Sequence, residues 1–196
     1  MEVLHLKKKL PNPSEGLRAY LIIISPPANI KQDVFNFKTE FFLNFGTARY
    51  IRSTAHISLS NFLIESTPEV TILNELHYLL KNKERFEVHT LGFDWFLYSN
   101  TLFLSVSENE IVNLQHHMVA VLRRRVKIGC QGTRKLEGPH ITIASKIPDY
   151  QFERSCKYFG EKNYSKAFMV DKVTVLRKNL SLNESHYNVA FETGLK

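Results

Sequence analysis

The order of apolar and polar residues along the chain predicts an alternation of strands and helices. Residues 17–25 form a nearly continuous apolar run that Pro26 and Pro27 end, which is typical of a buried strand. In the next segment, apolar residues recur every three or four positions up to Gly46. This spacing predicts an amphipathic helix with the apolar stripe Ile30, Val34, Phe37, Phe41 and Phe45.

The rest of the chain repeats these two patterns. Short apolar or alternating runs predict further strands at residues 54–59, 86–93, 101–106, 140–145, 168–176 and 186–191. Three more stripes with helical spacing predict helices that begin near residues 68, 107 and 148. The order strand, helix, strand, helix, strand therefore occurs twice, and one extra strand follows.

Helices and strands mixed in this order predict an α+β fold. The chain has 196 residues, of which 43% are hydrophobic, so it can bury one sizeable core. No segment has the composition of a linker. We therefore predict a single domain over residues 1–196 with two pseudo-symmetric lobes, approximately 15–98 and 99–196, with exchange of strands between the lobes allowed.

The sequence contains neither a secretory signal nor a membrane span. The first ten residues lack an apolar stretch of about 7–15 residues, and no apolar run approaches about 18 residues. We therefore expect a cytoplasmic, monomeric protein with no membrane contact. Cys130 and Cys156 do not have the spacing of metal ligands, so two free thiols are expected, with a disulfide between them as the alternative.

Positive charge is concentrated in one part of the chain. The formal net charge is +7, and residues 111–136 contain no acidic side chain. Such a field favours anionic partners, and nucleic acid or nucleotides are the natural candidates. The alternative is a solvated helix end, where cations also favour the helix dipole. The basic residues of this segment are Arg123, Arg124, Arg125, Lys127, Arg134 and Lys135.

Two short segments share one unusual pattern. Residues 56–59 read His-Ile-Ser-Leu, and residues 140–143 read His-Ile-Thr-Ile. An average composition gives only about 0.1 such motif per chain, so two copies at matching points of the two halves are informative. Because side chains alternate along a strand, the histidine and the hydroxyl of each motif lie on one face and the aliphatic residues on the other.

These residue types suit phosphoryl chemistry. Of two histidines on opposite sides of one phosphorus atom, one can take the proton of the attacking oxygen while the other protonates the leaving oxygen. The two hydroxyls can donate hydrogen bonds to the non-bridging oxygens, where negative charge sits in the transition state. This chemistry requires no metal ion.

The two H-x-[S/T]-hydrophobic strands, their separation and the repeated element order resemble the two-histidine (2H) phosphoesterases. The most similar branch is the 2′-5′ RNA ligase / RNA 2′,3′-cyclic phosphodiesterase (LigT-like) family. The resemblance implies a duplicated, bilobed fold with two antiparallel-type sheets flanked by helices around a central cleft. It also implies hydrolysis of a 2′,3′-cyclic or 2′-5′-linked phosphodiester at RNA ends or in small nucleotides, without a metal or other cofactor. The same groups would serve the reverse reaction, 2′-5′ RNA ligation.

By position in the motifs, the resemblance makes His56 and His140 the catalytic pair, and Ser58 and Thr142 the phosphate contacts. Serine stands in the first motif where threonine is common in the family, but the hydroxyl is kept. The sequence does not assign which histidine is the acid and which is the base.

Three cations near the motifs are candidate substrate contacts. In an extended strand, Arg52 would share the face of His56, and Lys146 that of His140. Arg134 lies in the loop before the second motif. The alternative for each is an ordinary exposed cation.

The remaining histidines lack the motif and are expected to be structural or exposed: His5, His77, His89, His116, His117 and His186. Phe93, Trp95 and Tyr98 form an aromatic group for which core packing is expected, with stacking on a base as the alternative.

Two rival functions remain. A non-catalytic RNA-binding or nucleotide-binding protein on the same fold would keep the charge pattern without turnover. A metal-dependent hydrolase is disfavoured, because the sequence has no H-E-x-x-H motif and no clustered carboxylates.

Overall fold

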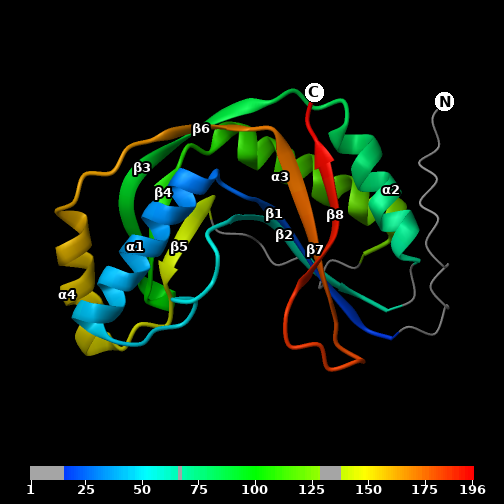
Figure 1. The fold of residues 1–196 in the computed structure, drawn as a ribbon. Helices are drawn as coiled ribbons and strands as arrows, with labels where there is room; N and C mark the ends of the chain where they lie inside the picture. The colour runs from blue at the N-terminus through cyan, green and yellow to red at the C-terminus, as the bar shows by residue number, and fades with distance from the viewer. Residues whose placement is uncertain (1–15, 66–67, 129–137) are drawn as a thin grey trace.

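The computed structural model describes residues 16–65, 68–128 and 138–196, and within these ranges it has eight strands and four α-helices (Figure 1). The strands are β1 (Arg18–Ile24), β2 (Ile57–Ile64), β3 (Phe86–Phe96), β4 (Thr101–Val106), β5 (His140–Ala144), β6 (Ala167–Val170), β7 (Lys172–Asn179) and β8 (Asn188–Gly194). The helices are α1 (Ala28–Phe45), α2 (Glu69–Leu80), α3 (Asn109–Val121) and α4 (Asp149–Gly160). A 3₁₀ turn, η1 (Leu97–Ser99), precedes β4, and a π-helical turn, η2 (Leu122–Val126), continues α3.

The described strands pair in one antiparallel order, β6-β3-β4-β5-β2-β1-β7-β8. Two sheets were expected from the sequence, and the structure corrects this expectation. Four strands lie on each side of the contact between β5 and β2, and in the described chain that contact consists of the single residue pair Ile57↔Ile141. The predicted α+β class is confirmed, and the two halves of the sheet meet through the motif strands.

Each half of the sheet combines elements from both parts of the chain. β3 pairs with β4 and β6, whereas β7 pairs with β1. Helix α1 packs against β5, and α3 packs against β2, so each of these two helices crosses to the opposite half (Figure 1). The two lobes, approximately 15–98 and 99–196 with exchange of strands allowed, stay a prediction.

The periodicity of the sequence explains which faces are buried. Tyr20, Ile22 and Ile24 alternate along β1 on the core side and are at most 1% exposed. The predicted stripe of α1 lies against the same core, with Phe37 only partly buried there. The strand expected at residues 168–176 is in fact two strands. They are separated at Asp171, because β6 joins one half of the sheet and β7 the other.

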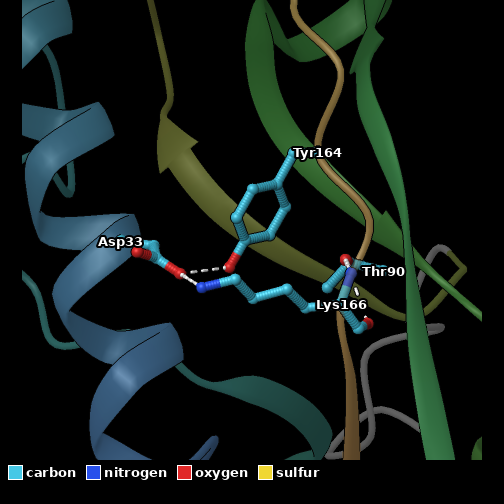
Figure 2. A network of polar contacts seen from close by, with 4 residues as sticks. All are labelled: Asp33, Thr90, Tyr164 and Lys166. Carbon is cyan, nitrogen blue, oxygen red and sulfur yellow. Dashed lines mark hydrogen bonds and ion pairs between the residues drawn. The ribbon is translucent and has the colours of Figure 1, made fainter.

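A polar network fastens α1 to the strands beside it (Figure 2). The Asp33 carboxylate accepts a hydrogen bond from the Tyr164 hydroxyl at 2.7 Å and an ion-paired one from Lys166 Nζ at 2.6 Å. The backbone of Lys166 is in turn bonded to Thr90 of β3, through the Thr90 amide at 2.8 Å and its hydroxyl. This network fixes the helix relative to the β3–β6 pair.

Two sequence expectations concern the solution state of the chain. Within the described ranges, no helix combines the length and the apolar character that crossing a bilayer requires. Cys156 is a buried free thiol on α4, whereas Cys130 lies outside the described residues, so the expected state of that thiol stays a prediction.

Replacing Ile57 by alanine should destabilise the protein by about 2–5 kcal/mol, because the side chain is fully buried at the junction of the two halves. The free energy of unfolding in urea measures this loss. Leu63→Ala on the same strand is the matched control, since Leu63 is 51% exposed. Equal losses in the two variants would contradict a special role for the junction.

Asp33→Asn should lower the free energy of unfolding at neutral pH by roughly 0.5–1 kcal/mol, the range for a partly exposed ion pair. The hydrogen bond from Lys166 holds the pKa of Asp33 below its usual value, so its contribution is present above about pH 4 and is lost as the pH falls further. The difference between parent and variant should therefore shrink in acid. Asp171→Asn, which removes an exposed carboxylate, should show no such pH dependence.

Candidate active site

A cavity of about 1510 Å³ lies where the two halves of the sheet meet. His56 and Ser58, at the start of β2, and His140 and Thr142, on β5, all line it. The structure therefore brings together the four motif residues predicted from the sequence. The predicted strand 54–59 begins too early, because β2 starts only at Ile57, directly after His56.

The junction between β2 and β5 sets how these four side chains face one another. Ile57 pairs with Ile141 in an antiparallel register, and both side chains are fully buried on the core side. Continuing this register by one residue in each direction sets His56 opposite Thr142, and His140 opposite Ser58. The register of this one pair thus predicts that each histidine lies across from the hydroxyl of the other strand.

Both imidazoles are oriented by the same local hydrogen bond. Nδ1 of His56 lies 2.9 Å from the carbonyl oxygen of Thr54, and Nδ1 of His140 lies 2.8 Å from that of Gly138. A carbonyl oxygen can only accept, so each Nδ1 must carry the hydrogen. In the neutral ring this leaves Nε2 with a free lone pair, and in the charged ring it leaves an Nε2–H donor. Both rings are thus prepared to exchange a proton through Nε2.

Burial lowers the pKa of both histidines below the usual value of about 6.5, because desolvation penalises the imidazolium. The hydrogen bonds to the two carbonyl groups oppose this shift. The positive charge of Lys38 lowers the pKa of His56 further, and a charge on His56 lowers that of His140. Without a bound anion, both rings are therefore mainly neutral at pH 7.

The surroundings of the two rings differ. The ring of His140 lies 5.1 Å from that of Phe96, in an edge-on arrangement, and 5.0 Å from that of Phe103. The ring of His56 instead experiences the positive charge of Lys38, a buried residue of α1. The pair is symmetric in its hydrogen bonds and asymmetric in its electrostatic environment.

Cations line the cavity beside the motif residues. Arg52 and Lys146 both contribute to its wall, as do the side chains of Arg49 and His186. The strand-parity argument for Arg52 and Lys146 is wrong, because both lie outside the strands and Lys146 has a φ of 52°. Of the described residues in this wall, Asp149 is the only acidic one. Arg134 lies outside the described residues, so its suggested role stays a prediction.

One rim of the cavity is built from the β3–β4 turn and the segment after β5. The Asn100 side-chain amide donates to the carbonyl oxygen of Ile147 at 3.0 Å and to Asp149 Oδ1 at 2.6 Å. The Ile147 amide donates back to the carbonyl oxygen of Asn100 at 3.1 Å. These bonds hold the rim in place, and the cations of the described wall still outnumber its one carboxylate.

The structure adds residues that the sequence did not single out. His186 and Tyr187, on the β7–β8 connection, line the cavity, and His186 is exposed there, as the sequence analysis expected. Tyr98 also lines it and is 68% exposed, which corrects the expected core packing, whereas Phe93 does pack on Phe37. No local pattern marks His186, because only the strand pairing of β7 and β8 brings it to the site.

In residues 16–65, 68–128 and 138–196, no three His, Cys, Asp or Glu side chains gather into a group that could hold a metal ion.

Comparison with known proteins places this arrangement among solved structures. A family model described as the 2′-5′ RNA ligase superfamily matches residues 26–181. No curated protein matches the sequence.

Solved structures share the fold. TT0787 of Thermus thermophilus has a TM-score of 0.63 at 16% identity, over 90% of this chain and 97% of that chain. Escherichia coli LigT complexed with 3′-AMP has a TM-score of 0.65 at 13% identity, and LigT complexed with phosphate 0.62 at 14%, each over 92% of this chain and 99% of LigT. At these identities, the similarity shows a shared fold.

Inorganic phosphate should raise the pKa of both His56 and His140, because a bound anion favours the imidazolium. The ring C–H signals in NMR titrations, with and without phosphate, report these values. His77 is the internal control, since it packs against Phe191 and does not line the cavity. A shift confined to one of the two rings, or shared by His77, would contradict a common anion site.

Proposed function

Since the chain belongs to the 2′-5′ RNA ligase superfamily, we propose that it is a phosphodiesterase that hydrolyses 2′,3′-cyclic phosphate or 2′-5′-linked phosphodiesters at RNA ends or in nucleotides. The observation that carries the proposal is that two histidines and two hydroxyls from the two motifs line one cavity. Both rings are bonded through Nδ1 to backbone carbonyl groups, which leaves both Nε2 atoms available for general acid–base catalysis.

In the proposed reaction, water attacks phosphorus and the bond from phosphorus to the 3′-oxygen breaks. Nε2 of one histidine accepts a proton from the attacking water, and Nε2–H of the other gives a proton to the leaving oxygen. The product carries a 2′-phosphate and a free 3′-hydroxyl, and proton exchange with solvent restores the pair. When a 5′-hydroxyl attacks the cyclic phosphate in place of water, the same two proton transfers form a 2′-5′ bond, and the 3′-oxygen again leaves as a hydroxyl.

The hydroxyls of Ser58 and Thr142 have a distinct part in this reaction. Each lies opposite the histidine of the other strand, so both face a phosphorus atom placed between the rings. Hydrogen bonds from them to the two non-bridging oxygens stabilise the charge that develops there. The proposed chemistry needs no metal ion, since both proton transfers and the charge stabilisation use side chains.

Two properties of the cavity support an anionic substrate larger than one small molecule. The wall is rich in cations, and its one described carboxylate is occupied by Asn100. Its volume of about 1510 Å³ exceeds the roughly 300–1000 Å³ of usual small-molecule pockets. The cavity therefore has room for nucleotides on both sides of the scissile bond. The complexes of LigT with 3′-AMP and with phosphate are consistent with a substrate of this class.

The neutral state of both rings has a mechanistic consequence. One imidazole must be neutral and the other charged during the reaction, whereas burial disfavours charge on both. An anionic phosphodiester supplies the opposite charge and favours the imidazolium. Substrate binding would thus create the protonated acid, while repulsion between the rings keeps the second one neutral.

His56→Ala and His140→Ala should each lower kcat on a 2′,3′-cyclic phosphate substrate by about 10²–10⁴-fold, because each removes one proton transfer. Initial rates on a cyclic mononucleotide, an oligoribonucleotide with a cyclic end and a 2′-5′-linked dinucleotide test the substrate class. His116→Ala, on the exposed side of α3, is the control and should keep parental rates. The parental rate should show a bell-shaped dependence on pH between 5 and 8.

Other outcomes of this experiment identify the rival functions. Binding of the oligonucleotide without turnover, little changed in either histidine variant, would identify a nucleotide-binding protein. Loss of turnover with a chelator would identify a metal-dependent hydrolase. A flat pH–rate profile would contradict the paired roles of the two histidines.

A further inference from the structure

Lys38 is a buried lysine on the apolar stripe of α1. It lies four residues after Val34 and three before Phe41, where the helical period calls for an apolar side chain. The whole residue is 3% exposed. Lysine is almost never buried to this extent without a specific set of partners, so its presence at this position requires an explanation.

All three hydrogens of the Lys38 ammonium group are donated in hydrogen bonds. Its Nζ donates to the carbonyl oxygen of Tyr50 at 2.8 Å, to that of Ser53 at 2.7 Å and to the Ser53 hydroxyl at 2.9 Å. An ammonium group has three hydrogens, and these three acceptors take all of them. All three acceptors are uncharged, so they solvate the positive charge without neutralising it.

These bonds stabilise a strained turn. Tyr50 has a φ of 66°, in the left-handed region that non-glycine residues rarely occupy. Its carbonyl oxygen also accepts the Ser53 amide at 3.0 Å and the Ser53 hydroxyl at 2.8 Å. On the opposite side, Arg49 and Ser145 exchange two backbone hydrogen bonds, at 2.9 and 3.0 Å. Segment 49–54 is thus fastened to α1 and to the end of β5.

Segment 49–54 forms one wall of the candidate active site. Tyr50, Arg52, Ser53 and Thr54 all line the cavity. The carbonyl oxygen of Thr54 also receives the hydrogen bond from Nδ1 of His56. A continuous set of contacts therefore runs from the Lys38 ammonium, through this segment, to the ring of His56.

We propose that Lys38 is a positioning residue, whose buried ammonium holds segment 49–54 in place and makes His56 the general base of the histidine pair. The proposal rests on the two-histidine hydrolysis proposed above. Since Lys38 does not line the cavity, it acts through the segment and through its electric field.

The electrostatic environment supports this assignment. Burial lowers the pKa of Lys38 to about 8, so it remains charged at neutral pH and disfavours a proton on His56. His140 faces the aromatic rings of Phe96 and Phe103, and the charge that opposes its protonation is that of His56 itself. When His56 stays neutral, that opposition disappears, and His140 becomes the ring that carries the proton to the leaving oxygen.

Other titratable or charged groups also line the cavity that holds the histidine pair. Arg49, Tyr50 and Arg52 belong to segment 49–54, Tyr98 to the turn before β4, Lys146 and Asp149 to the segment after β5, and His186 and Tyr187 to the β7–β8 connection. Lys38 differs from them in its burial and in its direct hydrogen bonds to segment 49–54.

Lys38→Met tests the proposal, because it keeps the length of the side chain and removes the charge and the donors. It should raise the pKa of His56, measured by NMR titration without substrate, and move the acidic limb of the kcat/KM profile to higher pH. A displaced wall should also lower kcat/KM by about 10–100-fold. Lys38→Arg, which keeps the charge, should restore the position of the acidic limb.

Lys157→Met, on the exposed side of α4, is the matched control and should leave the profile and the His56 titration unchanged. An unchanged His56 titration in Lys38→Met would overturn the proposal. A shift of the alkaline limb, with the acidic limb fixed, would overturn the assignment of His56 as the base. If Lys38→Met does not fold, Ser53→Ala, which removes one acceptor of the ammonium, still tests the positioning: it should lower kcat/KM, and an unchanged kcat/KM would overturn that role.

The titration also separates this proposal from the proposed function. A parent protein without turnover on any cyclic phosphate would refute the hydrolysis. The pKa of His56 in parent and Lys38→Met, with and without inorganic phosphate, would still decide whether Lys38 controls the protonation of that ring.

Discussion

The antiparallel pairing of Ile57 with Ile141 is the constraint on which the site depends. Both side chains are fully buried, so burial fixes the face on which their neighbours lie. If the register slipped by one residue, the histidine and the hydroxyl of one strand would point into the core, and its isoleucine would point into the cavity. Because the pair is antiparallel, it also relates the two motifs by an approximate twofold axis. This symmetry places a similar histidine on each side of one centre.

Desolvation sets the protonation state of the two histidines. Half-buried imidazoles bonded through Nδ1 to backbone carbonyl groups stay neutral in the absence of an anion and present Nε2 to the cavity. The cations of the wall and the buried charge of Lys38 leave the cavity with an excess of positive potential. A phosphodiester would compensate that charge and make protonation of one ring favourable. Binding and proton availability are thus coupled through the same electrostatic balance.

Helix α1 links the fold to the site by two different faces. Asp33 joins it to Tyr164 and Lys166, and through Lys166 to β3 (Figure 2). Lys38 joins it to the segment that bears Arg52. The position of the helix therefore determines the position of one cavity wall. This connection explains why the helix between β1 and β2 packs on the opposite half of the sheet, next to β5.

The sequence by itself determined the strands and helices to within a few residues, the α+β class, and the four motif residues of the cavity. These features rest on periods of two and 3.6 residues, which are local properties of the chain. Only the tertiary structure decided the order of the strands, the separation of β6 from β7 at Asp171 and the position of His186 in the cavity wall. The reason is that strand pairing joins segments far apart in sequence. The tertiary structure alone also revealed Lys38. A single lysine on an apolar stripe does not by itself indicate a role. Its role depends on the oxygens of Tyr50 and Ser53, which lie more than ten residues later in the chain and bind its ammonium group only in the folded structure.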